Sequence, residues 1–232
     1  MGEGKERHQE EIRRTFAIAS KEATLEQFLR FCKARKKEPK KYESFVRSGD
    51  CPVNSVTWYE AAEYCNWLSE REGIPQEQWC YLPNEEGFYA KGMKLAPQCL
   101  QRTGYRLPTD MEWEFSCRSG TATRFSFGAT EELAAKYAWH SLNSNNRSHR
   151  IARLKPNELG LFDMHGNAWE WCQAKDKESQ PLPLLITDDD RQVLRGGSFN
   201  HPVVSVRSAD RNFLEPWRFP GNAGFRLAKT VP

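Results

Sequence analysis

Hydrophobic residues recur at helical spacing in three stretches of the chain, and each stretch begins with the same polar arrangement. In the first stretch, Thr24 stands three residues before Gln27, which is the spacing of a capping box at a helix start. Apolar residues then follow at intervals of three and four; they are Leu25, Phe28, Leu29 and Cys32. We expect a helix here that buries this face and ends before Pro39.

Two further stretches repeat the arrangement. Thr57 with Glu60, and Thr109 with Glu112, have the same capping-box spacing. The expected buried face of the second helix consists of Ala61, Tyr64, Cys65 and Leu68. Glycines placed to end these two helices are Gly73 and Gly120.

The rest of the chain has a less regular pattern. The segment from Pro75 to Arg102 predicts an insertion with short strands, and Gly- and Asn-rich, strand-like segments follow the third helix. Residues 174–190 are typical of a surface loop. We therefore expect an α+β domain with long loops over residues 17–232, preceded by a polar N-terminal extension over residues 1–16.

Composition narrows the class of protein. The 232 residues are 38% hydrophobic and 12% aromatic, with eight Trp, which indicates a folded, loop-rich protein whose core contains large rings. A net charge of +3 is too small to predict a nucleic-acid-binding surface. No apolar run reaches the roughly 20 residues that span a bilayer, and the charged N-terminus lacks the apolar stretch of a secretory signal. We expect a cytoplasmic protein without a membrane span.

The seven cysteines indicate reduced thiols. They form no C-x-x-C pair, and an odd number cannot all pair within one chain. Buried free cysteines behave as small hydrophobic residues, which we prefer to a disulfide framework. Six Lys or Arg residues between Lys33 and Lys41 indicate either a phosphate-binding patch or, as we prefer, a solvated helix end.

Five motifs, in order, carry a family resemblance: "PVNSVTWYEAAEYCNWL", "GYRLPTDMEWEFSCRSG", "NELGLFDMHGNAWEWC", "LRGGSF" and "GFRLA". Together they resemble the formylglycine-generating enzyme (sulfatase-modifying factor) family over roughly Ala17 to Thr230. The resemblance implies an α+β fold of the C-type lectin kind, loop-rich, with a few capped helices and short antiparallel strands.

We do not expect the catalytic chemistry of that family in this chain. Its enzyme oxidises a cysteine in a sulfatase peptide with two copper-binding cysteines, which lie between the "GGS" and "R-x-A-x-R" elements. Here that interval, residues 199–206, contains no cysteine, and soft thiolates are what Cu(I) requires. His201 is the only soft-to-borderline ligand in the interval, so we expect no copper. Ser198 and Asn222 match polar positions of the family's groove, although turn and backbone hydrogen bonding explains them equally well.

A related branch of the family uses three histidines to hold iron, supplied largely by an extra N-terminal helical domain. The five histidines here are scattered, which disfavours that chemistry; they are His8, His140, His149, His165 and His201.

The resemblance also implies a structural calcium ion in "FDMHGNAWEW". The ligands carried over are the side chain of Asp163, the backbone carbonyls of Gly166 and Ala168, and the carboxylate of Glu170. All are hard oxygen donors, which calcium prefers. The alternative is a turn kept for packing, with Trp169 and Trp171 buried and no metal.

The C-terminal segment between the last two motifs is the candidate binding surface, over residues 199–221. Loops on a rigid scaffold often carry function, and large aromatic and arginine side chains serve as binding anchors. The candidate contact residues are His201, Val203, Val204, Asp210, Phe213, Leu214, Trp217, Arg218, Phe219 and Pro220. The alternative for any one of them is that it folds inward and completes the core.

Two non-catalytic uses of this fold match such a surface: the hypervariable receptor proteins of diversity-generating retroelements, and sensor domains appended to bacterial protein kinases. We therefore expect a non-catalytic module that binds a protein or small-molecule ligand. The alternatives are an oxidoreductase of the family with altered chemistry at His201 or Ser198, and an assembly subunit with a large apolar patch.

Overall fold

The computed structural model describes residues 11–38, 46, 48–175 and 185–232. The three expected helices are α1 (Leu25–Ala34), α2 (Trp58–Arg71) and α3 (Asp110–Arg118), and each begins with a complete capping box. The three predicted boxes are thus confirmed; each depends only on two residues three positions apart in sequence. Gly73, at φ 71°, follows the end of α2 as predicted.

The expected buried face of α1 is wrong at one position. Leu29 is 38% exposed, whereas Phe31 is fully buried. The rings of Phe31 and Tyr64 lie 5.5 Å apart, and those of Phe31 and Trp67 lie 5.6 Å apart, so packing against α2 sets the rotation of α1. Helix α1 ends at Ala34, and Pro39 lies outside the described residues.

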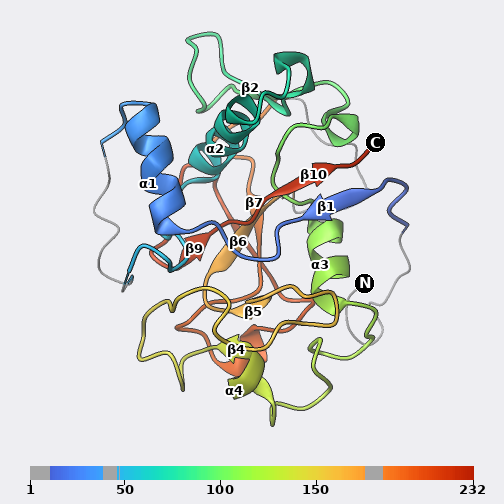
Figure 1. Cartoon of the computed structure of the whole chain (residues 1–232). Coiled ribbons are helices and arrows are strands. Elements are labelled where there is room, and N and C mark those ends of the chain that lie inside the picture. Colours follow the sequence, from blue (N-terminus) through green and yellow to red (C-terminus); the bar gives the residue numbers. More distant parts are fainter. Residues whose placement is uncertain (1–10, 39–45, 47, 176–184) are drawn as a thin grey trace.

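Strands from distant parts of the chain form a central mixed β-sheet (Figure 1). Its order is β8 (Arg211–Leu214), β7 (Gln192–Arg195), β6 (Trp169–Lys175) and β9 (Ala223–Gly224), and only the β6–β9 pair is parallel. The two ends of the domain meet where β1 (Phe16–Ile18) pairs with β10 (Ala228–Thr230).

The remaining elements are short. They are the hairpin of β2 (Tyr81–Leu82) and β3 (Lys94–Leu95), helix α4 (Ala134–Tyr137), the parallel pair of β4 (Ala138–Trp139) and β5 (His165–Gly166), and 3-10 turns at Gln76–Gln78, Cys99–Gln101 and Val203–Ser205. The short strands expected between Pro75 and Arg102 are thus confirmed, as is the α+β fold. No helix among the described residues has the length and apolarity needed to span a membrane.

Large rings form the main core between the helices and the sheet, as the composition predicted. Trp58 and Trp171 are fully buried, and their indole N–H groups donate to the carbonyls of Cys172 (3.0 Å) and Val56 (2.9 Å). All seven cysteines are free and buried, which confirms the reduced-thiol interpretation.

The loop expected over residues 174–190 is only partly described, because residues 176–184 lie outside the described chain. The described end packs onto the protein. Leu185 forms an antiparallel bridge with Lys94, Ile186 is buried, and the Tyr59 hydroxyl donates to Asp188 over 3.0 Å.

Candidate binding surface

The loop that follows β7 starts with two glycines for a steric reason. Gly197 has a φ of 74°, and a Cβ built there would lie 2.6 Å from the carbonyl oxygen of Ser205 and 2.5 Å from a methyl carbon of Val206. Only glycine fits this left-handed backbone at such a close approach. The "GGS" motif therefore lets the far end of the 199–206 loop fold back against its own start.

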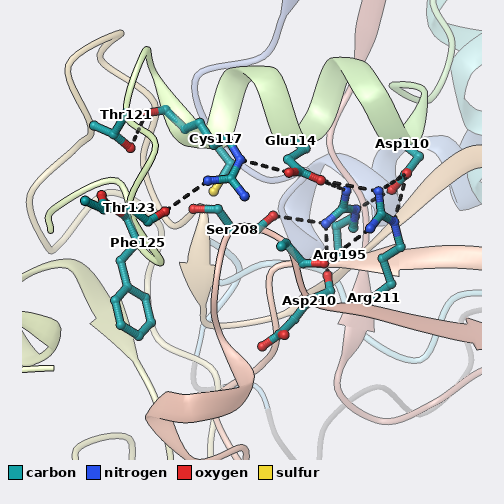
Figure 2. Close-up of polar contacts among 12 residues, drawn as sticks. Asp110, Glu114, Cys117, Thr121, Thr123, Phe125, Arg195, Ser208, Asp210 and Arg211 are labelled. Atoms are coloured by element: carbon teal, nitrogen blue, oxygen red, sulfur yellow. Dashed lines mark hydrogen bonds and ion pairs between the residues drawn. The ribbon is translucent and has the colours of Figure 1, made fainter. Parts of the chain in front are cut away.

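A buried ion-pair network fixes the strands on either side of that loop (Figure 2). Arg195 of β7 pairs with Asp110 and with Glu114 (2.5 Å), two carboxylates of α3, and donates to the carbonyl of Ser208 over 3.0 Å. Arg211 of β8 donates to the second oxygen of Asp110 over 3.0 Å. Burial alone would raise the pKa of Glu114, but the charges and hydrogen bonds of Arg195 and Arg118 together outweigh burial and lower that pKa.

Further hydrogen bonds hold the loop itself. The amide of Phe199 donates to the carbonyl of Asn167 (2.9 Å), and the hydroxyl of Ser144 donates to the carbonyl of Phe199 (2.7 Å). The buried ring of His165 contacts the Val206 carbonyl through Nδ1 at 2.7 Å. Burial lowers the pKa of His165 to about 4, so this ring is neutral at pH 7.

Polar side chains join the 199–206 loop to the last loop of the chain. The amide of Asn222 donates to Ser198 Oγ (3.0 Å) and to Asn200 Oδ1 (2.9 Å), and Ser198 Oγ lies 2.7 Å from His201 Nδ1. The His201 ring packs edge-on against Trp169. Ser198 is fully buried, and burial lowers the pKa of His201.

The 215–222 loop rests on the start of α2. Its carbonyls at Pro216 and Pro220 accept hydrogen bonds from the amides of Trp58 (3.0 Å) and Ser55 (3.2 Å). Two rings on this loop nevertheless face solvent, because Trp217 is 45% exposed and Phe219 is 59% exposed. Arg218 pairs with Glu215 (3.1 Å) and lies over the Trp217 ring at 4.7 Å.

A third loop, over residues 140–147, lies against the 199–206 loop and was not identified from the sequence. The amide of Ser141 donates to the His201 carbonyl over 2.9 Å. Leu142 is 86% exposed. The only signal was the Asn- and Ser-rich run "SLNSNN", which predicts turns; Asn145 and Asn146 indeed have positive φ. We call residues 140–147, 199–206 and 215–222 together the three-loop surface.

The candidate contact residues divide into two groups. Val203 is 7% exposed within an apolar cluster, and the partly buried Phe213 and Leu214 lie in β8 and pack against the core. Asp210 pairs with Arg207 at 2.6 Å. The candidate contact residues that reach solvent on the three-loop surface are His201, Val204, Trp217, Arg218, Phe219 and Pro220, of which His201 and Pro220 do so only in part.

Residues expected to bind calcium lie in a buried, charged region. Glu170 accepts two hydrogen bonds of 2.6 Å from Arg226 and one of 2.6 Å from the Trp113 indole. Asp163 accepts from the amide of Ala152 over 2.7 Å. Gly166 and Ala168 are buried in the same motif. Both carboxylate oxygens of Glu170 therefore already accept hydrogen bonds from Arg226 or Trp113.

A further carboxylate, Glu22, completes this region. It is 2% exposed and accepts from the Asn167 side chain (2.7 Å) and the Ala168 amide (3.1 Å). Burial raises the pKa of Glu22, and the charges of Asp163 and Glu170 raise it further. Burial likewise raises the pKa of Asp163 to about 6.

Glu22, Asp163 and Glu170 thus lie close to a single guanidinium, that of Arg226, which pairs with Glu170. Protons or a divalent cation would relieve the excess negative charge. In the described part of the chain, no group of three or more His, Cys, Asp or Glu side chains is arranged to hold a metal ion. The expected site also uses two backbone carbonyls, so calcium stays a prediction.

Several known proteins are similar in sequence to this chain. Chaperone protein LppX of Paenibacillus barcinonensis is 28% identical over 74% of this chain and 65% of its own length. Serine/threonine-protein kinase pkn1 of Chlamydia pneumoniae is 27% identical over 95% of this chain, which corresponds to 34% of the kinase. The formylglycine-generating enzyme of Streptomyces coelicolor is 30% identical over 54% of this chain and 46% of the enzyme. The chain therefore spans 65% or less of these relatives.

Solved structures show the same fold. Treponema denticola variable protein 1 superposes with a TM-score of 0.77 at 27% identity, covering 93% of this chain and 84% of that one. CarF superposes with a TM-score of 0.71 at 23% identity, covering 94% and 87%. The model of the sulfatase-modifying factor enzyme 1-like domain matches residues 1–231, and the chain belongs to that family.

Proposed function

We propose that this chain is a non-catalytic protein-binding module and that its partner contacts the three-loop surface. The observation that carries the proposal is the exposure of four large apolar side chains on loops that are otherwise tightly fixed. They are Leu142, Val204, Trp217 and Phe219. Exposed aromatic side chains of this kind are typical anchors of protein interfaces.

The fixed backbone supports the proposal. The Arg195 network, the two glycines and the Asn222 hydrogen bonds hold the loops without a partner. A surface that is already ordered loses little conformational entropy on binding, so its exposed anchors contribute more to affinity.

The relatives also support it. A protein named as a variable protein shares the fold over 93% of this chain, and the match to the kinase covers about a third of that protein. In that kinase the matching region is a part of a longer protein, as expected for a sensor domain, and a sensor domain acts by binding a ligand.

Affinity capture tests the proposal. The full chain and its Trp217→Ala/Phe219→Ala variant are used as baits in lysate of the cell that makes the protein, and bound proteins are quantified by mass spectrometry. We expect at least one partner that the wild type retains and the variant loses. A Phe115→Ala variant is a matched control, because Phe115 on α3 is 57% exposed. Identical partner lists for all three baits contradict the proposal.

One observation favours a second candidate, catalysis at Ser198. Its hydroxyl lies 2.7 Å from Nδ1 of His201, and a neutral histidine can act as a base towards a serine. Ser198 is fully buried, however, and also hydrogen-bonds with Asn200 and Asn222, which is a structural arrangement. If the wild type showed a catalytic activity and the Ser198→Ala variant lost it while keeping its fold, catalysis would be favoured over binding.

A further inference from the structure

A pocket of about 320 Å³ lies between the C-terminal end of α1, the side of α2 and the loop that joins β2 to β3. Its volume falls at the lower end of the range for small-molecule sites, about 300–1,000 Å³. The pocket is lined by Arg35, Lys37, Glu63, Gly87, Phe88 and Tyr89. None of these residues belongs to the three-loop surface.

The two cations of the pocket have hydrogen-bond donors to spare. Arg35 pairs with Glu70 at 2.5 Å through one nitrogen, and Lys37 pairs with Glu63 at 2.6 Å. A guanidinium has five N–H groups and an ammonium has three. These pairs therefore use only part of the donor capacity, and Glu63 is the one carboxylate in the lining.

Tyr89 adds a neutral donor. Its hydroxyl oxygen accepts a hydrogen bond of 2.8 Å from the amide of Asn66, whose second contact is the Tyr81 carbonyl at 2.6 Å. Asn66 is 1% exposed, so this amide holds Tyr89 in place. No acceptor for the Tyr89 hydroxyl hydrogen occurs in the parts of the chain that the structure describes. Burial raises the pKa of Tyr89, so the hydroxyl keeps its proton at neutral pH.

Phe88 supplies an aromatic wall. Its side chain is 62% exposed although it lines the pocket, so its ring is free to stack against a ligand. A surplus of donors selects a ligand rich in acceptors, and an anion gains most because charge-assisted hydrogen bonds are the strong ones. A flat apolar wall beside these donors selects an aromatic ring.

We propose that this pocket binds a small aromatic anion, an aryl phosphate or aryl carboxylate. The ring lies on Phe88, and the anionic group accepts hydrogen bonds from Arg35, Lys37 and Tyr89. This site is separate from the proposed protein-binding surface, and its existence does not depend on that function.

Isothermal titration of the full chain with phenyl phosphate tests the site, with benzyl alcohol and inorganic phosphate as the uncharged and ring-free probes. We expect saturable binding of phenyl phosphate at millimolar concentrations and at least tenfold weaker binding of the two other probes. Tyr89→Phe keeps the ring but removes the hydroxyl donor together with the hydrogen bond that this hydroxyl accepts from Asn66. Phe88→Ala removes the aromatic wall. Each substitution should weaken phenyl phosphate binding about tenfold or more.

Phe115→Ala is the matched control, because it removes a ring of similar exposure, 57% against 62% for Phe88, from helix α3, outside the pocket lining. Absence of saturable phenyl phosphate binding overturns the proposal. Equal loss of affinity in Phe115→Ala and Phe88→Ala overturns it as well, and so does equal affinity for inorganic phosphate, because the ring would then contribute nothing.

Discussion

Arg226 and Glu170 form a bidentate ion pair inside the protein, with both nitrogen–oxygen distances at 2.6 Å and neither side chain exposed. The pair connects the "WEW" segment of β6 to the "GFRLA" motif near the C-terminus. Arg226 also donates to the carbonyl of Ala19 over 3.1 Å, so one guanidinium holds three separate parts of the chain.

We therefore predict that Arg226→Met destabilises the protein by about 3–5 kcal/mol, because it leaves the Glu170 carboxylate buried without its partner. Urea unfolding measures the loss. In the double variant with Glu170→Gln, part of the stability should return, since no unpaired charge is left. If the double variant lost the sum of both single losses, the two residues would be energetically independent.

The raised pKa of Asp163 predicts a pH dependence with a definite sign. Burial raises this pKa to about 6, above the ordinary value of about 3.9. Between these values the folded state holds a proton that the unfolded state has lost, so the contribution of Asp163 to stability falls as pH rises through this window.

Asp163→Asn isolates that contribution. Asparagine tolerates the positive φ of 57° at this position, and its side-chain oxygen can still accept from the Ala152 amide. With a chelator present, we expect the variant to be more stable than the wild type above pH 6 by about 3 kcal/mol, and equal to it below pH 4. A difference that does not change with pH would contradict the assignment.

Calcium is tested on the same pair of proteins. If calcium neutralises the buried carboxylates, adding it at pH 7.5 should raise the Tm of the wild type, and Asp163→Asn should remove most of that rise. The measurement is a thermal melt with and without calcium after chelator treatment. An unchanged wild-type Tm would show that protons and Arg226 alone neutralise the cluster.

Substitutions at the three-loop surface should separate exposed residues from core residues. Trp217→Ala and Phe219→Ala are expected to change the free energy of unfolding by no more than about 0.5 kcal/mol, because both side chains lie on the surface, 45% and 59% exposed. Val203→Ala should cost about 1.5 kcal/mol or more, at about 0.8 kcal/mol for each buried carbon removed. Equal losses of stability at all three positions would contradict the division of these residues into exposed contact residues and core residues.

The sequence was sufficient wherever structure depends on near neighbours. The capping boxes at Thr24, Thr57 and Thr109 determine helix starts within one turn, and all three are present. The rotation of α1 was not predictable, because Phe31 replaces Leu29 in the core only through contacts with α2.

The binding surface shows the same limit. Trp217 and Phe219 could be proposed from residue type, but Val203 and Phe213 have similar character and pack inward. The 140–147 loop carries no motif of the family, and tertiary contacts with Phe199 and His201 bring it to this surface.

Site-specific photo-crosslinking tests the central claim most directly. A benzophenone amino acid is placed at position 219 of the full chain in its own cell, and at position 115 as the control, since Phe219 and Phe115 are 59% and 57% exposed. The account predicts a discrete crosslinked partner from position 219 that position 115 does not give. The same adducts from both positions, or none from position 219, would contradict it.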